Sequence, residues 1–140
     1  CIMRLPKISL DTNVFIFGLR KIDPFAGIIL KYLFQFDVRI SAQVDRELRI
    51  NLTEKEFHQF YELIGLLSTF HIVYQPPADT LLTLYRQFGL KTGDAKIAAF
   101  CEQENIEIIV SENRHFLQKL PKRSFEVIDS MTFCQKFSLK

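Results

Sequence analysis

Three acidic residues stand in surroundings that otherwise favour burial or the first turn of a helix. Asp11 follows the apolar segment KISL, Glu47 lies within an apolar helical pattern, and Asp94 follows Thr-Gly at the start of an alanine-rich helix. A buried carboxylate is normally paired, hydrogen-bonded or bound to a metal ion. Carboxylates that converge repel one another unless a cation lies between them, and Mg²⁺ and Mn²⁺ prefer oxygen ligands. The three acids therefore suggest a divalent metal site.

Each acid also has an ordinary structural explanation. Asp11 can cap the helix that is expected to begin at Thr12, and Asp94 can interact with the dipole of its own helix. Glu47 can form an ion pair with a basic neighbour on the same helix. These explanations suffice for each acid alone, but they do not explain why the acids gather at strand ends and helix starts.

Polar residues follow two of the predicted strands. Asp11-Thr12-Asn13 come after KISL, and Ser111-Glu112-Asn113 come after IEIIV. In open α/β sheets, ligands bind beyond the carboxyl ends of the strands, so these two segments are expected to lie at the site. Alternatively, Ser111 caps the next helix and Glu112 lies in solvent.

Apolar periodicity alternates along the chain between short β-rich segments and helical patterns. It predicts strands at 7–10, 37–41, 70–74, 106–111 and 125–128. It predicts helices at 12–20, 24–36, 41–52, 53–68, 78–88, 92–105, 114–119 and 130–137. Strands that alternate with helices indicate an α/β fold with a mostly parallel sheet of about five strands.

Helix start signals support several of these boundaries. The expected N-cap residues are Asp23, Ser41, Thr53 and Ser130. Pro24 occupies the first helical position after its cap, where proline is favoured. Thr53 and Glu56 have the spacing of a capping box, in which each side chain bonds the other residue's backbone N–H.

Length and composition limit the class of protein. The 140 residues, 48% hydrophobic and 24% charged, are typical of one globular domain, here residues 1–140. No apolar segment approaches the roughly 18–20 residues needed to span a membrane, and the N-terminal residues do not resemble a signal peptide. We therefore expect a cytoplasmic protein with no membrane partner.

The spacing of cysteine argues against disulfide-rich and zinc-binding proteins, while the net charge leaves a nucleic-acid partner possible. The three cysteines are widely spaced and odd in number, which argues against a disulfide framework and a zinc site. The three histidines are isolated from one another. A net charge of +2 permits a nucleic-acid partner without requiring one.

Four segments, in this order, resemble the PIN-domain family. They are LDTNV at 10–14, AQVDREL at 42–48, GDAKIAA at 93–99 and IVSENRHF at 109–116. The resemblance implies a three-layer α/β/α ribonuclease with an acidic pocket that holds Mg²⁺ or Mn²⁺ and an RNA substrate. Many chains of this size in the family are toxins of VapBC-type toxin–antitoxin pairs, so it also implies an antitoxin partner and a homodimer.

The same resemblance assigns roles to individual residues. Asp11, Glu47 and Asp94 match the family's first three acids, which bind the metal and act in catalysis. The fourth acidic position falls on Asn113, which departs from the family's pattern. Glu112 is the neighbouring acid that can replace it only if its side chain points the same way.

Further residues are assigned supporting roles by the resemblance. Asn13 and Ser111 are expected to orient the carboxylates, as residues around a metal site commonly do. The candidates for contact with RNA phosphates are Lys7, Arg20, Lys91 and Arg114. Each of these cations is also explained as an ordinary solvated surface charge.

Other folds and functions fit less well or remain as rivals. A haloacid-dehalogenase-type phosphotransferase normally needs a second Asp two residues after the first, where this chain has Asn13. A receiver domain would require an early acidic pair and a late lysine after a strand, and neither is evident. The sequence contains neither a P-loop nor G-x-G-x-x-G, which argues against a nucleotide cofactor. The remaining rival is a catalytically weak PIN domain that binds RNA or protein, since Asn113 replaces an acid.

Overall fold

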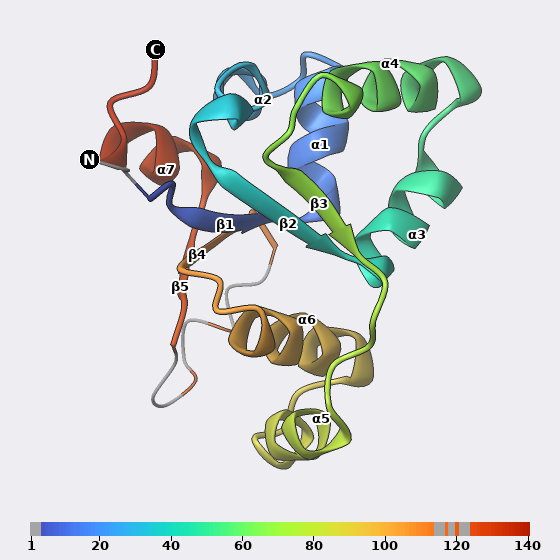
Figure 1. Cartoon of the computed structure of the whole chain (residues 1–140), viewed down its shortest axis with the longest axis vertical. Helices are drawn as coiled ribbons and strands as arrows, with labels where there is room; N and C mark the ends of the chain where they lie inside the picture. Colours follow the sequence, from blue (N-terminus) through green and yellow to red (C-terminus); the bar gives the residue numbers. More distant parts are fainter. Residues whose placement is uncertain (1–3, 114–116, 118–119, 121–123) are drawn as a thin grey trace.

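Five short strands form a fully parallel sheet in the order β3-β2-β1-β4-β5 (Figure 1). The computed structural model describes residues 4–113, 117, 120 and 124–140. The strands are β1 (Lys7–Leu10), β2 (Asp37–Ser41), β3 (Phe70–Val73), β4 (Ile108–Val110) and β5 (Glu126–Ile128). This arrangement confirms the predicted α/β fold, with a sheet that is entirely parallel.

Helices cover both faces of the sheet, as in a three-layer α/β/α fold (Figure 1). The helices are α1 (Thr12–Leu19), α2 (Pro24–Lys31), α3 (Ala42–Asn51), α4 (Glu54–Gly65), α5 (Asp79–Gln87), α6 (Thr92–Gln103) and α7 (Ser130–Lys136), with a 3₁₀ turn, η1 (Leu33–Gln35). One layer contains α1, α2, α4 and α7, and the other contains α5 and α6. Helix α3 lies near the carboxyl edge of the sheet and contacts both α1 and α6.

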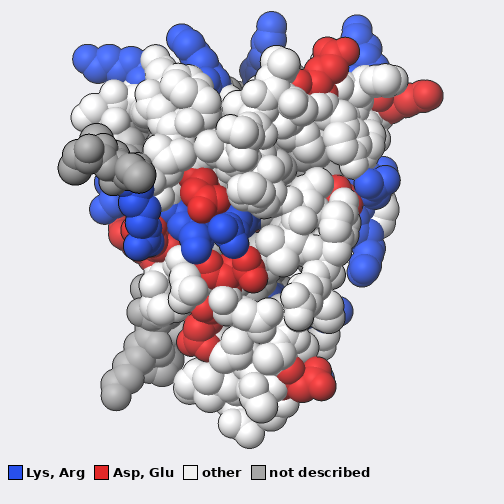
Figure 2. Space-filling model, viewed as in Figure 1, with Lys and Arg blue, Asp and Glu red and all other residues white. Residues whose placement is uncertain are grey.

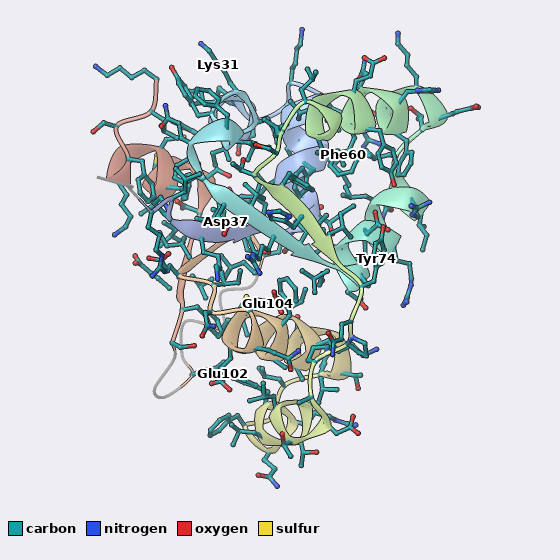
Figure 3. All side chains as sticks on the ribbon, viewed as in Figure 1. Lys31, Asp37, Phe60, Tyr74, Glu102 and Glu104 are labelled. Carbon is teal, nitrogen blue, oxygen red and sulfur yellow. The ribbon has the colours of Figure 1, made fainter. Side chains whose placement is uncertain are left out.

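Apolar side chains fix the helices on the sheet. The strand residues Ile8 and Leu10 are fully buried at the centre of the core. Phe15 on α1 packs edge-on against Phe60 on α4, which Figure 3 labels, with 5.3 Å between ring centroids, and both rings contact Phe70 on β3. Aromatic pairs in such T-shaped arrangements add to the stabilisation from burial. This packing holds the start of α1, and with it Asp11, at the end of β1.

Most predicted helix starts are confirmed. Asp23 caps α2 through the backbone N–H of Phe25, and Ser41 caps α3 through that of Val44. The capping box of α4 is formed in both directions. The prediction of Ser130 as the N-cap of the last helix was wrong. The side chain of the preceding residue, Asp129, accepts the cap hydrogen bond.

Two helices end earlier than their apolar patterns predicted. Helix α2 stops at Lys31, and the pattern continues only as the η1 turn, while α4 stops at Gly65. The first helix begins at Thr12, as predicted, and Asp11 is its N-cap. The helix predicted at 114–119 falls almost entirely outside the described residues.

The face shown in Figure 2 carries positive and negative side chains mixed together. On this face Arg39 pairs with Asp37 at 3.4 Å and with Glu104 at 3.1 Å, and Figure 3 labels both acids in the same view. In the part of the chain that the structure describes, no helix has the length and apolar character needed to cross a membrane.

Candidate metal-binding pocket

Asp11 occupies the junction between β1 and α1. Its backbone N–H donates to the Val110 carbonyl at 2.9 Å, which continues the pairing of β1 with β4. The carboxylate is buried and accepts hydrogen bonds from the Thr12 backbone N–H at 2.8 Å and from the Ser111 hydroxyl at 2.9 Å. The helix-cap explanation of Asp11 is therefore correct, and the carboxylate also borders a pocket.

Glu47 projects from α3 toward the same junction. One of its carboxylate oxygens accepts a short hydrogen bond from the Thr12 hydroxyl, and the other accepts one from the Gln43 amide at 3.1 Å. The ion pair expected of Glu47 within its helix is made instead by Asp45, whose carboxylate lies 3.0 Å from Arg49. Glu47 is thus available to the pocket, and Thr12 links it to Asp11.

Both carboxylates line one cavity of about 370 Å³, which opens to solvent. The polar residues that line it are Asp11, Thr12, Asn13, Arg20, Glu47, Asn51 and Asn113. The Asn51 amide donates to the Glu47 backbone carbonyl at 2.8 Å, which holds this wall of α3 in place. Apart from the Arg20 guanidinium, the polar groups are carboxylates, amides and a hydroxyl, which offer the oxygen ligands that Mg²⁺ and Mn²⁺ prefer.

Asp94 lies at the same edge of the sheet but does not line this cavity. Helix α6 precedes β4 and runs back along the sheet, so its first turn, which carries Asp94, is at the carboxyl edge (Figure 1). Among the described residues, no group of three or more His, Cys, Asp or Glu side chains is close enough to hold a metal ion. Asp11 and Glu47 therefore border one cavity, and Asp94 lies at the same edge of the sheet but is not part of its lining.

The polar residues that follow β4 lie in two places, with Ser111 and Asn113 near Asp11 and Glu112 at the start of α7. Ser111 lies beneath Asp11 and also accepts a hydrogen bond from the Asn113 backbone N–H at 3.3 Å. Asn113 is exposed and lines the cavity. The Glu112 carboxylate instead accepts from the Ser130 backbone N–H at 2.9 Å, at the start of α7. Glu112 therefore does not replace the acid missing at Asn113.

Of the predicted phosphate-binding cations that fall within the described residues, Arg20 alone borders the cavity. Arg20 lines it, but its guanidinium is held by Glu56 at 2.7 Å and by the Asn51 carbonyl at 3.2 Å. The Glu56 carboxylate raises the pKa of Arg20, and the Arg20 guanidinium, with the Thr53 backbone N–H, lowers the pKa of Glu56 to about 2. Arg20 therefore lines the cavity as one partner of an ion pair with Glu56.

Two of the other predicted cations lie away from the cavity. Lys7 is at the amino end of β1, at the opposite edge of the sheet, in a depression with Asp37 and His71. Lys91 is exposed at the N-cap of α6. Arg114 falls outside the described residues. Lys7 is therefore misplaced as a contact for substrate in this pocket, because its position in the strand puts it at the wrong end.

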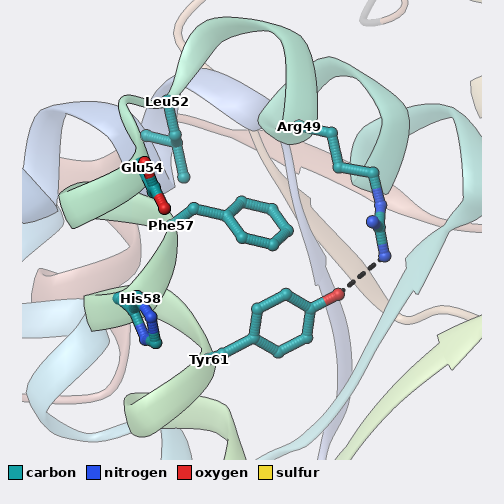
Figure 4. Close-up of a pocket in the computed structure, with 6 residues that line it drawn as sticks. All are labelled: Arg49, Leu52, Glu54, Phe57, His58 and Tyr61. Atoms are coloured by element: carbon teal, nitrogen blue, oxygen red, sulfur yellow. Dashed lines mark hydrogen bonds between the residues drawn. The ribbon is translucent and has the colours of Figure 1, made fainter.

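A larger cavity of about 740 Å³ lies between α3 and α4 and does not involve the predicted acids. Figure 4 shows the Arg49 guanidinium donating to the Tyr61 hydroxyl, at 2.8 Å, beside Phe57 and His58. The Arg49 guanidinium also lies 5.3 Å from the Phe57 ring centroid, in a cation–π contact. Size alone thus does not identify the site.

Sequence reasoning did not assign three residues that organise the pocket. The Thr12 hydroxyl joins the two acids, and Gln43 and Asn51 fix Glu47 from one helical turn before and after it. The i,i+4 spacing of Gln43 and Asn51 around Glu47 is visible in the sequence and predicts that they share its face. No local pattern predicts the bond from Thr12, because it joins elements that meet only in the fold.

Comparisons with known proteins agree with this fold. A chain in the crystal structure of VapBC2 from Rickettsia felis bound to a DNA fragment from their promoter superimposes with a TM-score of 0.60 at 23% identity, covering 86% of this chain and 98% of that one. PAE2754 from Pyrobaculum aerophilum gives a TM-score of 0.59 at 17% identity, with 97% and 98% covered.

A sequence profile gives the family. No curated protein sequence matches this chain. The profile described as PIN domain matches residues 8–121, which include Asp11, Glu47, Asp94 and Asn113. With the parallel sheet and the match over most of its length, the chain belongs to the PIN domain family.

Proposed function

We propose that this chain is a metal-dependent ribonuclease that hydrolyses RNA phosphodiester bonds in the pocket between Asp11 and Glu47. One observation carries the proposal: two carboxylates from separate elements border one cavity and are joined through Thr12. A stable core alone does not require an acid on α3 to face a second, buried acid. The family, whose members are generally nucleases, supports the same activity.

The side chains present fit a divalent cation. Mg²⁺ typically binds through one or two carboxylates, several waters and the substrate's phosphate, which is the donor set that this pocket offers. A carboxylate oxygen has two lone pairs, so a hydrogen bond accepted by Asp11 or Glu47 is compatible with a bound ion. Asp11 and Glu47 would hold the ion directly, and Asp94, outside the cavity lining, would act through water.

The proposed reaction adds water to the phosphorus atom of the RNA backbone. Glu47 orients the water and accepts its proton, while the bond from phosphorus to one ribose oxygen breaks and that oxygen is protonated. When bound, Mg²⁺ or Mn²⁺ lowers the pKa of water and offsets the charge that develops on the phosphate. Asn13 and Asn113 border the cavity as neutral hydrogen-bonding groups for substrate oxygens.

We further propose that the chain is the toxin of a VapBC-type toxin–antitoxin pair. It would form a homodimer in the cytoplasm and be inhibited by an antitoxin protein. The resemblance in fold to a chain of the VapBC2 complex supports this assignment. In that pair, the antitoxin would be encoded beside this chain, so a small neighbouring open reading frame is expected.

A catalytically weak PIN domain is the second candidate, and one observation favours it. The fourth acidic position is an exposed Asn113, and the Glu112 carboxylate is hydrogen-bonded to the backbone at the start of α7. With fewer carboxylates, a second metal ion would bind less well than the first. Such a domain would bind RNA or protein without cutting.

Cleavage of single-stranded RNA by the purified chain in Mg²⁺, in Mn²⁺ and in EDTA tests the proposal. We expect cleavage with either ion, none in EDTA, and recovery when excess metal is restored. Glu47→Gln should reduce the rate by about 10²–10⁴-fold, the usual contribution of a general base. RNA binding without cleavage in any metal would favour the second candidate, and cleavage that continues in EDTA would contradict metal dependence.

A further inference from the structure

A second, smaller cavity of about 240 Å³ adjoins the acidic pocket at the carboxyl edge of the sheet. It lies between α3, the segment that follows β3, and α6. Gln43 lines this cavity and donates to the Glu47 carboxylate at 3.1 Å, and Glu47 lines the acidic pocket. The two cavities are therefore linked through the hydrogen bond between Gln43 and Glu47, and they lie at the same edge of the sheet.

The charges around this second cavity favour an anion. Its lining includes Arg46 and Lys96 but no Asp or Glu. No carboxylate within the described part of the chain lies within ion-pairing distance of either cation. By contrast, Arg20, Arg39 and Arg49 are each paired with an acid. Two unpaired cations beside an acid-free cavity are suited to bind phosphate groups.

An aromatic side chain stands at the rim. Tyr74 follows β3 and is 61% exposed, and Figure 3 shows it at the end of the strand between α3 and α6. Tyr74 also lines the cavity, so a ring that is largely open to solvent lies beside the cations Arg46 and Lys96.

The floor of the cavity is apolar. Phe100 is 3% exposed, and Leu82 and Pro77 complete this side. An aromatic ring above an apolar floor, with cations at the rim, is the combination by which proteins bind unpaired nucleotides. The volume is below the roughly 300–1,000 Å³ of pockets for drug-sized ligands, so it suits one nucleotide of a strand.

We propose that this cavity binds a nucleotide of single-stranded RNA next to the bond that is cut, with its base on Tyr74 and its phosphates on Arg46 and Lys96. The inference rests on the proposed ribonuclease function and adds that the substrate is unpaired at this point. A base inside a duplex is already stacked between its neighbours, and it cannot stack on Tyr74 without leaving them.

Fluorescence anisotropy of a labelled, unstructured RNA oligonucleotide in EDTA measures this binding without cleavage. Tyr74→Ala should weaken binding about 5- to 150-fold, the range for the loss of one base–aromatic stack. Tyr74→Phe keeps the ring and should bind within a fewfold of the native chain. The double variant Arg46→Ala/Lys96→Ala should weaken binding and reduce the salt dependence of log K by about 1.4, or about 0.7 per phosphate contact.

Two control variants change the same kinds of side chain far from the cavity. Phe34→Ala removes an exposed aromatic ring, and Lys31→Ala removes an exposed cation on α2, and neither should alter RNA affinity. A blunt duplex of the same length should bind more weakly than the single strand and be insensitive to Tyr74→Ala.

The outcomes separate this inference from the proposed function. It is overturned if the native chain does not bind the single strand, or if the Tyr74 and Arg46/Lys96 variants bind like the native chain. It is also overturned if Tyr74→Ala weakens duplex binding equally. Cleavage in Mn²⁺ by variants with unchanged affinity would leave the nuclease intact and remove the subsite. Absence of cleavage with the expected affinity losses would support the subsite and contradict the nuclease.

Discussion

Thr12 connects the two acids of the pocket through different atoms. Its backbone N–H donates to Asp11, and its hydroxyl donates to Glu47. Because Thr12 is 5% exposed and begins α1, the positions of both carboxylates depend on one ordered residue. At this scale the sequence singled out Asp11 and Glu47, but it could not predict that Asp45, and not Glu47, would pair with Arg49 on α3.

We predict that Thr12→Val reduces RNA cleavage about 10- to 100-fold, the usual cost of removing a group that orients a metal ligand. Valine has nearly the same shape but cannot donate to Glu47. Thr12→Ser keeps the hydroxyl and should retain most of the activity. Cleavage kinetics, together with urea unfolding to check the fold, provide the measurement, and a Thr12→Val rate equal to that of the native chain would contradict the role of Thr12.

At the scale of elements, local chemistry predicted the helix starts and the fold determined the ends. The cap of α2 at Asp23–Pro24 and the capping box of α4 at Thr53–Glu56 involve residues close in sequence, so the sequence alone predicts them. Helix α2 ends at Lys31, although apolar spacing continues to Phe36, because the chain turns there to enter β2. At α7 both Asp129 and Ser130 are suitable N-cap residues. Because β5 ends at Ile128, Asp129 takes the cap position.

Two glycines in the first helical hairpin should respond in opposite ways to alanine. A Cβ on Gly18 would lie 2.6 Å from the Leu30 side chain and 3.1 Å from the Ala26 carbonyl, so Gly18→Ala should destabilise the fold by about 1–3 kcal/mol. A Cβ on Gly27 meets nothing within 4 Å, so Gly27→Ala should stabilise α2 by about 0.4–1 kcal/mol. Urea unfolding midpoints measure both, and equal effects would contradict the close approach of α1 and α2.

The ion pair between Arg20 and Glu56 should make stability depend on acid pH. The pKa of Glu56 is lowered from 4.5 to about 2, so its contribution is complete above pH 4.5 and is lost as the pH falls through about 2. The Tm difference between the native chain and Glu56→Gln should therefore be largest above pH 4.5 and shrink toward pH 2. Glu54→Gln, in the same helical turn, is the control, and a pH-independent difference for Glu56→Gln would contradict the pair.

At the scale of the whole molecule, alternating periodicity was sufficient to predict the α/β class, and the parallel sheet follows from strands joined by helices. The sequence also placed Asp11, Glu47 and Asp94 at one edge of the sheet. It could not fix the distances among them, because those depend on how α3 and α6 pack beside the strands. Asp94 accordingly does not line the pocket that the other two acids share, and its role in the site stays a prediction.

The proposed homodimer is a prediction at this scale. Several large apolar side chains are exposed on the single chain, including Ile50 at 74% and Leu66 at 87%, and a partner surface would cover some of this area. Light scattering of the purified protein at tens of micromolar should give twice the 16.4 kDa mass of the chain. A monomer at that concentration would contradict the prediction.

The most direct test of the central claim is the rate of single-stranded RNA cleavage in Mn²⁺ by the native chain and by Asp11→Asn. The amide keeps the size of the buried side chain but removes the charge that would hold the ion, so we expect cleavage to fall below detection. Asp79→Asn, which removes an exposed acid from the first turn of α5, should cleave at the native rate. Cleavage by a folded Asp11→Asn variant at the native rate would contradict the assignment of this pocket as the active site.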